Sequence, residues 1–515
     1  MSRINTNVQS LIAQRILSGN NQMLSQSLER LSTGLRINRG KDDPAGLIVS
    51  ERLRSEIGAT NAAISNAERA DQVVNIAEGG LQEVSSLLTE LQGLVTTSAS
   101  TAGLSIEEKE ANQLQIDSIL QTIDRISSAT SFQGIKLLNG NFDYQVSNID
   151  SAVDAYTVNG AKFNSGSSVD VDVVITQSAQ LAGQFLSFGA ATLDLQSSGG
   201  TFTIEISGSE GSRELTFNSS VSMENIADAI NTFTDVTGVI ASSVVGGTGV
   251  TINSDQYGSS QFVSVKIVDD GGVQQGTVGI YSFDPDAART LDAGSVVDFD
   301  SDAASNGQRD VGQDLGATIN GQTATSNGRD LRINTDFLDV KLTINSSNAE
   351  ALGTIDAFEI TGGGADFQLA PNVDIAGKVS IGLQEVASRK LGQVDVSTTT
   401  GETDFRFLDD MGSGKLLNVV DGDLTAAQDV IANAISEVSG IRGRLGAFQK
   451  NVVSATIRSL NIANENTAAA QSLIRDADFA AETASLTRNQ ILVSASTNVL
   501  SLANSQPQQV LQLLG

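Results

Sequence analysis

Residues 427–469 read AQDVIANAISEVSGIRGRLGAFQKNVVSATIRSLNIANENTAA, and apolar or small side chains recur along them in alternating steps of four and three. The recurring positions are Ala427, Ile431, Ala434, Val438, Ile441, Leu445, Phe448, Val452, Ala455, Ser459, Ile462, Asn466 and Ala469. This spacing places them on one narrow stripe of a helix and is typical of a coiled coil. No proline lies between Pro371 and Pro507. The segment therefore predicts a continuous helix of about 60 Å.

The same spacing recurs near both ends of the chain, in residues 63–95, 116–126, 4–35 and 492–513. An ordinary helical bundle would also give such stripes, but their length and their placement at both ends favour a rod in which N-terminal and C-terminal segments pair. We expect packing and polymerisation contacts at Ile4, Val8, Leu11, Leu24, Leu28, Leu31, Leu35, Leu81, Val84, Leu88, Leu91, Ile431, Val438, Ile441, Leu445, Phe448, Val452, Leu492, Val499, Leu502, Val510 and Leu513.

The centre of the chain changes to the two-residue period of β-strands. Residues 202–206 and 215–217 alternate around a Gly-Ser-Glu-Gly turn, which indicates a hairpin, and residues 262–267 end at an Asp-Asp-Gly-Gly turn. Between these two segments, Ser222 is a candidate cap for a short amphipathic helix. Residues 331–333, 340–344 and 358–360 continue the strand pattern. The expected fold class is α+β, with long coiled-coil helices from both termini and one or more inserted β-rich outer domains.

Charge follows the same division. The whole chain of 515 residues has a net charge of −29, of which residues 151–410 carry −23, residues 1–150 carry −5 and residues 411–515 carry −1. Nearly neutral ends suit segments that pack together, and the acidic centre suits a surface in water.

The residue types that are missing exclude most catalytic chemistry. The chain has no Cys, His or Trp, so it has no disulfides, no zinc finger, no Ser-His-Asp triad and no thiol nucleophile. An acidic chain also repels nucleic-acid phosphates. We therefore expect a protein that is not an enzyme, has no cofactor and has no nucleic-acid partner.

Two local motifs resemble ligand sites weakly. Residues 298–302, DFDSD, begin like a calcium loop, but Ala303 and Arg309 occupy the positions that need Gly and Glu. Residues 412–415, GSGK, end like a phosphate loop, but Leu416 follows where Ser or Thr is needed. A solvated acidic loop and a flexible linker are the favoured interpretations.

The N-terminal residues, MSRINTN, are polar and precede no apolar run with a cleavage site, and no run approaches the length of a membrane span. We expect a chain with no membrane partner. If it is exported, it uses a route that leaves it uncleaved.

Several longer motifs occur in a fixed order at the two ends. Residues 31–47 read LSTGLRINRGKDDPAGL, residues 123–126 read IDRI with FQG at 132–134, and residues 474–480, 490–492 and 506–514 read IRDADFA, QIL and QPQQVLQLL. These motifs resemble those of bacterial flagellins, the subunits of the flagellar filament, and the resemblance covers roughly half of the chain.

The physical interpretation of the same motifs is helix punctuation, because Asp, Asn, Gly and Pro favour turns and helix starts. Asp43 before Pro44 predicts the start of a second long helix, and Asp478 with Glu482 predicts a cap on the last one. The candidate motif residues are Arg36, Asn38, Asp42, Asp43, Pro44 and Gly46 at the N-terminal turn and Arg475, Asp476 and Asp478 near the C-terminus.

The resemblance implies three discontinuous domains. Residues 1–44 with 475–515 would form a terminal coiled-coil core domain. Residues 45–150 with 367–474 would form a helical rod domain with a β-hairpin, and residues 151–366 would form the variable, β-rich outer part. This β-rich part is similar to insertion modules of larger flagellins and of the filament cap.

The resemblance also implies a function and partners. The chain would be exported unfolded through the flagellar type III apparatus, with its C-terminal helix, about 475–515, held by an export chaperone. It would then polymerise with itself into a helical filament for swimming motility, outside the cell, next to the hook-associated junction and cap proteins. Flagellins that stimulate immunity carry an arginine where this chain has Glu90 and a glutamate where it has Gln115, which implies weak toll-like receptor recognition.

Two alternatives stay open on the residues alone. A junction or cap protein would share the export route and related helices, although the match at both termini favours the filament subunit. A carbohydrate-binding or adhesive surface protein would account for the β-rich centre.

Overall fold

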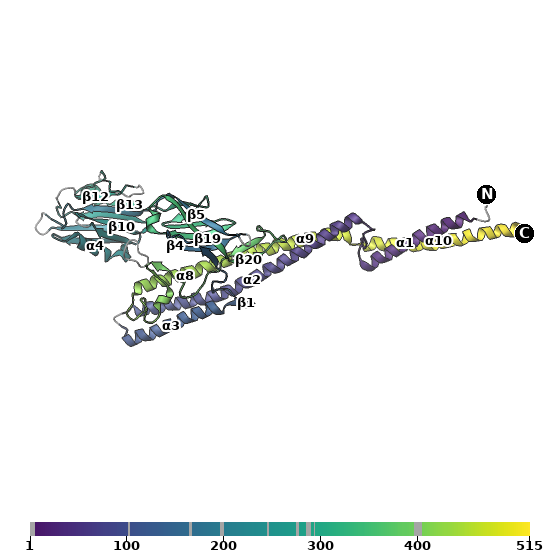
Figure 1. Cartoon of the computed structure of the whole chain (residues 1–515), viewed down its shortest axis with the longest axis horizontal. Coiled ribbons are helices and arrows are strands. Elements are labelled where there is room, and N and C mark those ends of the chain that lie inside the picture. The colour runs from purple at the N-terminus through teal and green to yellow at the C-terminus, as the bar shows by residue number, and fades with distance from the viewer. Residues whose placement is uncertain are drawn as a thin grey trace. The chain divides into compact units, whose positions relative to one another are not determined.

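The structure is a computed structural model that describes residues 6–514 except 101–102, 164–166, 196–199, 245–246, 274–277, 285–289, 293 and 396–403, with side chains up to residue 506 other than residue 395. The chain divides into two compact units. Unit 1 consists of Met1–Val74, Phe367–Lys378 and Leu445–Gly515, and unit 2 of Asn75–Asp366 and Val379–Arg444. Long helices lie near both ends of the sequence and the strands lie between them, so the predicted α+β class is confirmed (Figure 1).

Unit 1 pairs helices from opposite ends of the chain. Helices α1 (Val8–Thr33) and α10 (Phe479–Leu514) lie side by side (Figure 1). The side chain of Asn7 accepts the backbone N–H of Ser10 and caps α1, and Gly34 ends α1 with a φ of 74°, a left-handed conformation that glycine adopts without strain. The last helix thus packs against the first, in agreement with the predicted pairing of N-terminal and C-terminal segments.

The apolar stripe predicted for residues 427–469 moves to another face of the helix in its middle. Helices α8 (Leu424–Ala447) and α9 (Ser454–Arg475) are joined by a π-helical turn, Phe448–Val453. The stripe positions up to Phe448 are buried. Val452, the next predicted position, is half-buried, and its neighbour Val453 is buried instead. Beyond it the less exposed positions include Ile457, Leu460, Asn464, Thr467, Gln471 and Ile474, whereas Ser459, Ile462, Asn466 and Ala469 of the predicted series are exposed. The wider turn adds one residue, which rotates the following helix face.

Helices also form the first part of unit 2. Helix α2 (Pro44–Ser98) begins in unit 1 and continues into unit 2, where α3 (Ile106–Ala129) and α8 run beside it (Figure 1). Ser105 and Glu108 form a capping box that starts α3. Asn112 of α3 donates to Ser98 of α2 at 3.0 Å, and Arg442 of α8 pairs with Glu78 of α2 at 2.8 Å. The buried faces of these helices include Leu81, Val84, Leu88 and Leu91 of α2, Ile116 and Ile123 of α3, and Ile431, Val438 and Ile441 of α8.

The rest of unit 2 contains two β modules. The first β module, residues 144–177 and 316–363, has two sheets, in the strand orders β15-β14-β5-β19-β3 and β16-β17-β18-β4. Its core lies between them and includes Val171, Leu342 and Ile360. Its elements are β3 (Tyr144–Ser147), β4 (Val153–Ala161), β5 (Val169–Gln177), β14 (Gly316–Ile319), β15 (Gln322–Thr323), β16 (Thr325–Asn327), β17 (Asp330–Asn334), β18 (Leu338–Ile344), α7 (Ser346–Ala349) and β19 (Gly353–Gly363).

The second β module, residues 181–311, is inserted within the first. Its sheets have the orders β12-β6-β10-β9 and β13-β11-β7-β8. Its core includes Leu186, Ile204 and Val265, with Ile226 from the helix α4. Its elements are β6 (Leu181–Ser187), β7 (Thr201–Ser207), β8 (Ser212–Asn218), α4 (Met223–Asn231), α5 (Thr234–Thr237), β9 (Val239–Ser243), β10 (Gly249–Tyr257), β11 (Phe262–Asp269), β12 (Gly279–Ser282), α6 (Asp302–Asn306) and β13 (Gln308–Val311).

Short elements complete the chain. They are β1 (Ser131–Phe132), β2 (Ile135–Lys136), β20 (Ala365–Gln368), β21 (Lys378–Ile381), β22 (Val394–Asp395), β23 (Phe405–Arg406) and the 3₁₀ turn Leu408–Met411. Strands β7 and β8 pair antiparallel with Phe202 opposite Phe217, and Ser222 caps α4, so the predicted hairpin and cap are confirmed. None of the helices described here is both long enough and apolar enough to span a membrane.

Candidate assembly site

The two terminal motifs meet each other. Leu35 and Asp476 form an antiparallel β-bridge. On its two sides the N–H of Arg36 donates to the carbonyl of Arg475 at 2.7 Å, and the N–H of Ala477 donates to the carbonyl of Gly34 at 2.9 Å. We call this contact, residues 34–36 with 474–477, the terminal joint. Sequence reasoning placed both motifs at helix breaks, but nothing in their spacing indicated that they bind each other.

Charged side chains reinforce the terminal joint. Arg36 donates from its guanidinium to the carbonyl of Ile474 at 2.7 Å. Arg475 pairs with Glu51 of α2 at 2.8 Å, and Arg30 of α1 lies 3.8 Å from Glu482 of α10. Exposed ion pairs add little stability individually, so their main effect is to fix the register of the two segments.

The N-terminal turn is closed by carboxylates. Asp42 accepts the N–H groups of Asn38 and Arg39, and the hydrogen bond from Arg39 lowers the pKa of the Asp42 carboxyl. Asp43 accepts the N–H of Gly46 at 2.9 Å, which caps α2 directly before Pro44, its first residue. The predicted start of the second long helix is therefore confirmed.

The C-terminal motif is closed in the same way. Asp478 accepts the N–H groups of Ala480 and Ala481 at 2.9 and 3.1 Å, at the start of α10. A carboxylate at a helix N-terminus satisfies free donors and suits the helix dipole. The predicted cap by Asp478 is confirmed.

The face between α1 and α10 is lined by small and polar side chains. Its buried members are Ala13, Asn20, Ser27, Ser496 and Ala503. Asn20 donates to the hydroxyl of Ser496 at 2.6 Å, and Asn489 donates to the hydroxyl of Ser27 at 3.1 Å. These positions recur every seven residues, at 13, 20 and 27 and at 489, 496 and 503. This seven-residue repeat of small or polar residues is the sequence signal for the buried face, and the prediction from large apolar residues did not include it.

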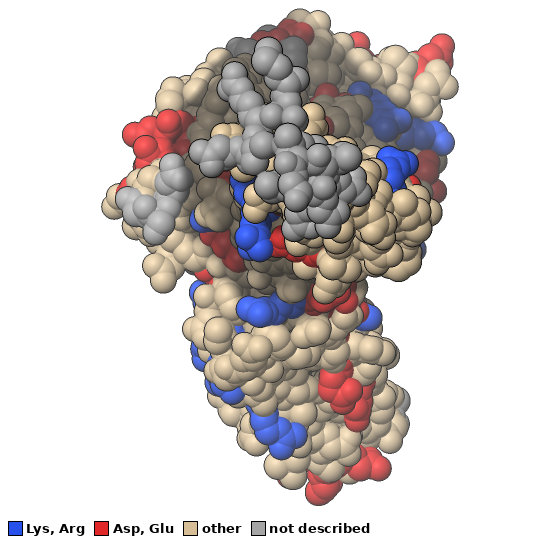
Figure 2. All heavy atoms as spheres, turned by 90° about the vertical axis from the view of Figure 1, so that its right-hand side faces the viewer, with Lys and Arg blue, Asp and Glu red and all other residues tan. Residues whose placement is uncertain are grey.

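Several large apolar side chains of the same helices are exposed rather than buried in this face. Leu11 and Leu502 are 59% and 61% exposed, and Val8, Leu28, Leu492 and Val499 are exposed as well. Leu24, Leu31 and Leu35 are half-buried. Ile4 lies outside the described residues, as do the side chains of Val510 and Leu513. In the view of Figure 2 most of the visible surface is uncharged, with acidic and basic side chains in small separate groups.

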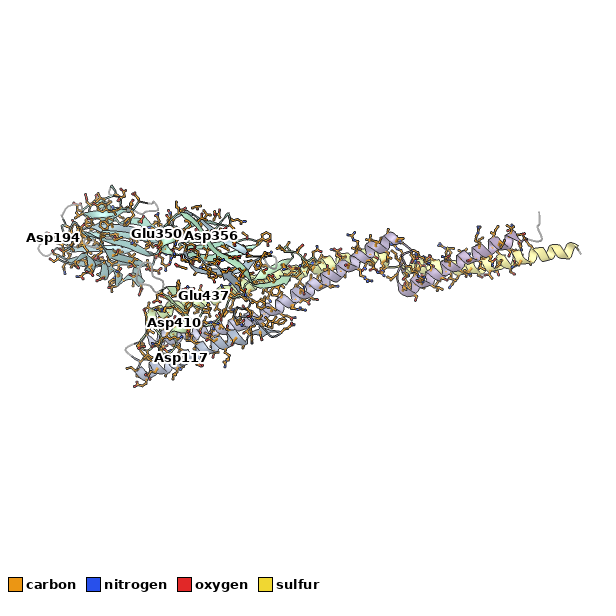
Figure 3. All side chains as sticks on the ribbon, in the orientation of Figure 1. Asp117, Asp194, Glu350, Asp356, Asp410 and Glu437 are labelled. Atoms are coloured by element: carbon orange, nitrogen blue, oxygen red, sulfur yellow. The ribbon has the colours of Figure 1, made fainter. Side chains whose placement is uncertain are left out.

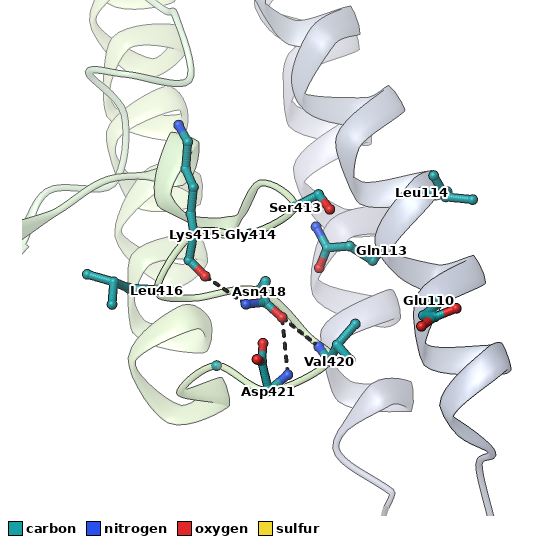
Figure 4. A pocket seen from close by; sticks show the side chains of 11 residues that line it. Glu110, Gln113, Leu114, Ser413, Gly414, Lys415, Leu416, Asn418, Val420 and Asp421 are labelled. Atoms are coloured by element: carbon teal, nitrogen blue, oxygen red, sulfur yellow. Dashed lines mark hydrogen bonds between the residues drawn. The ribbon is translucent and has the colours of Figure 1, made fainter.

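The segment that resembles a phosphate loop is fixed in place. Gln113 of α3 donates to the carbonyl of Met411 at 2.8 Å and accepts the N–H of Val419 at 2.9 Å. Asp117 of α3 accepts the N–H of Ser413 at 2.9 Å. Figure 4 shows the loop beside α3, around an open pocket of about 650 Å³. The expected flexible linker is therefore wrong, because two side chains of α3 hold the loop and one of them is a carboxylate that would repel phosphate.

Carboxylates are spread over unit 2 rather than gathered. Figure 3 shows Asp117, Asp410 and Glu437 on the helical part and Asp194, Glu350 and Asp356 on the β modules. Over the described parts of the chain, no three Asp or Glu side chains are arranged to hold a metal ion. In the loop 298–302, Ser301 caps α6 through the N–H of Ala304.

Helices from both chain ends, joined by matching motifs and carrying exposed apolar stripes, define a structural protein built for association with copies of itself. The chain matches the bacterial flagellin N-terminal helical region over residues 4–143 and the bacterial flagellin C-terminal helical region over residues 428–514. It belongs to the flagellin family, whose members are structural subunits of the extracellular flagellar filament and not enzymes.

Curated relatives match over the full length. The chain is 29% identical to a flagellin of Salmonella choleraesuis over 545 residues and 29% identical to the B-type flagellin of Pseudomonas aeruginosa over 525 residues, with 99% of each chain covered. Among solved structures, the flagellar cap protein FliD of Escherichia coli (domains D1-D2-D3) matches 66% of this chain and 98% of its own, at 12% identity and a TM-score of 0.27. The family assignment rests on the sequence matches alone.

Proposed function

We propose that this chain is exported unfolded by the flagellar type III apparatus and polymerises with itself outside the cell into the helical filament used for swimming. The observation that carries the assembly step is the set of exposed apolar side chains on α1 and α10, two helices whose fully buried shared positions are small or polar. Full burial of one large apolar side chain contributes about 1.5–3 kcal/mol. Several such side chains from each copy would make association favourable, through contacts that repeat without closing.

Charge supports an outward position for the β modules. Residues 151–410 carry −23 of the net −29, and like charges at the outside keep neighbouring filaments apart and soluble. The domains we propose for this arrangement are 1–44 with 475–515, 45–150 with 367–474, and 151–366.

Charge substitutions on the apolar stripe test the assembly step. Leu28→Glu and Val499→Glu each place a carboxylate on an exposed apolar position, and we expect both to abolish seeded filament growth seen by electron microscopy. Gln22→Glu adds the same charge at an exposed polar position of α1 and is the matched control. Growth of Leu28→Glu at the rate of the control would contradict the proposal.

The terminal helices also serve as the proposed partner surface before assembly. Removal of residues 475–515 deletes α10 and the C-terminal half of the terminal joint, and we expect it to abolish both filament formation and binding of the export chaperone. A truncated chain that retains both activities would overturn this part of the proposal. The junction and cap proteins are the partners we propose at the two ends of the filament.

We also propose weak recognition by toll-like receptors. Glu90 on α2 and Gln115 on α3 are both exposed, so their side chains are accessible but differ in charge from those of stimulating flagellins. A receptor reporter assay on the wild-type chain should give a weak response, and Glu90→Arg with Gln115→Glu should raise it. A wild-type response equal to that of a strong agonist would refute the proposal.

A further inference from the structure

The contact between the first β module and helix α8 is polar. A crevice of about 810 Å³ lies there, lined on one side by residues of β4, β17 and β18 and on the other by residues of α8, among them Arg332, Lys341, Asn433 and Glu437. Parts of one chain move relative to each other unless the interface between them is large and apolar. An interface that contains an open crevice therefore needs specific polar contacts to hold one orientation.

Arg444 crosses this crevice. It lies in the last turn of α8, and its guanidinium donates to the side-chain carbonyl of Asn159 in β4. The amide nitrogen of Asn159 donates in turn to the carboxylate of Asp339 in β18 at 3.3 Å, and Asp339 pairs with Arg332 of β17 at 3.3 Å. One chain of polar contacts thus runs from the helix into three neighbouring strands of the first β module.

The surroundings of Arg444 explain why the contact is specific. Burial lowers the pKa of the Arg444 guanidinium, while the carboxylates of Asp339 and Asp143 act in the opposite direction. An arginine keeps its charge at physiological pH, and its planar fork of donors fixes direction as well as distance. Removing this side chain would leave the side-chain carbonyl of Asn159 in a half-buried site without its donor.

Residues 382–392, in the segment that connects the first β module to α8, make mainly backbone contacts. The N–H of Gly382 donates to the backbone carbonyl of Asn159 at 2.8 Å, the N–H of Leu383 donates to the carbonyl of Phe142 at 2.9 Å, and the N–H of Gly392 donates to the Glu437 carboxylate at 3.0 Å. These bonds hold the connecting segment in place, whereas Arg444 links the helix directly to a strand.

We infer that Arg444 is a positioning residue that fixes the orientation of the first β module on α8. This role concerns the folded subunit and does not depend on polymerisation, so it can be tested on the monomer.

The absence of cysteine makes a distance measurement direct. Thr354→Cys on β19 and Glu83→Cys on α2 introduce two exposed labelling positions, and double electron–electron resonance between spin labels reports the spread of module orientations. We expect one narrow distance peak for the otherwise wild-type chain and the loss of that peak on Arg444→Gln. Asn159→Ala should broaden the distribution equally, and the double variant should be no broader than either single variant, because both remove the same contact.

Arg442→Gln is the matched control. Arg442 lies two residues earlier on α8 but pairs with Glu78 of α2, so its loss removes the same charge without touching the β module and should leave the peak narrow. A narrow peak for Arg444→Gln, or equal broadening for Arg442→Gln, would overturn the inference. Circular dichroism checks folding, and if Arg444→Gln does not fold, a folded Asn159→Ala chain with a narrow peak overturns it as well.

Discussion

At the scale of single residues, the N-terminal turn depends on the absence of one side chain. A Cβ added at Gly46 would lie 2.5 Å from a carboxylate oxygen of Asp43 and 2.8 Å from the terminal methyl of Ile37, which is buried. We expect Gly46→Ala to displace the helix cap and to destabilise unit 1 by about 1–3 kcal/mol, the usual cost of overpacking. Gly58→Ala is the control, because nothing lies within 4 Å of its Cβ on the same helix, and it should stabilise the chain by about 0.5–1 kcal/mol. Urea unfolding curves compare the two, and equal stabilities would contradict the role given to Gly46.

Burial of Tyr144 makes the free energy of unfolding depend on pH in the alkaline range. Burial raises the pKa of Tyr144 to about 12, and its hydroxyl accepts the N–H of Ala161 at 2.9 Å. Between the usual pKa of about 10 and this raised value, the unfolded chain loses the phenol proton while the folded chain keeps it. The stabilisation from the protonated Tyr144 is thus fully present below pH 10 and is lost as pH rises through 12. This loss lowers the free energy of unfolding by up to about 3 kcal/mol. Tyr144→Phe should remove this part of the decline in unfolding free energies measured from pH 9 to 12. Parallel declines in both chains would exclude Tyr144 as the cause.

At the scale of elements, the π turn Phe448–Val453 carries one residue more than an α-helix needs. Deleting the exposed Asn451 would leave the buried Phe448, Val453 and Leu460 and the half-buried Ile457 in steps of four, four and three, which an α-helix accommodates. We expect this deletion to turn the π turn into α-helix with little change in melting temperature. Deleting the exposed Ala463 instead rotates the rest of α9 by about 100°, and should lower the melting temperature strongly. Thermal unfolding followed by circular dichroism separates the two, and equal melting temperatures would contradict the account.

The same element shows what a sequence pattern can and cannot predict. The period of four and three placed Leu81 to Leu91 and Ile431 to Phe448 at buried positions, because local spacing determines which side of a helix is apolar. The same period predicted that the buried positions continue through Val452, because nothing in the local sequence indicates a π turn. It also could not tell that α1 and α10 meet through Asn20 and Ser496, because the choice between two faces of a helix depends on the partner. For the same reason the motifs at Leu35 and Asp476 gave turns but not their pairing.

At the scale of the whole molecule, the chain is a series of insertions. The second β module interrupts the first between β5 and β14, and the first interrupts the helical segments. At the inner boundary Gln180 and Gln313 pair in both directions, each N–H donating to the other's carbonyl at 2.9 Å. The chain therefore leaves and re-enters the first module at adjacent points. Such an arrangement allows the inserted module to vary while the core of the first module stays closed.

Excising the second β module tests this nesting. Replacing residues 181–312 by the two-residue turn Asn-Gly joins Gln180 to Gln313 as a tight hairpin, since these residues already pair antiparallel. The first core keeps all its buried members and loses only the half-buried Tyr257 of β10, which packs against it. We therefore expect the shortened chain to fold with the helical content of the parent and nearly the same first-module stability, and to polymerise. Replacing residues 169–177 by the same turn removes β5 from the middle of a five-stranded sheet and should unfold the first module although far fewer residues are lost. Circular dichroism and hydrogen exchange at β18 and β19 measure both outcomes. Rapid exchange at those strands in the first deletion would mean that the two modules share one cooperative core and that the second is not an independent insertion.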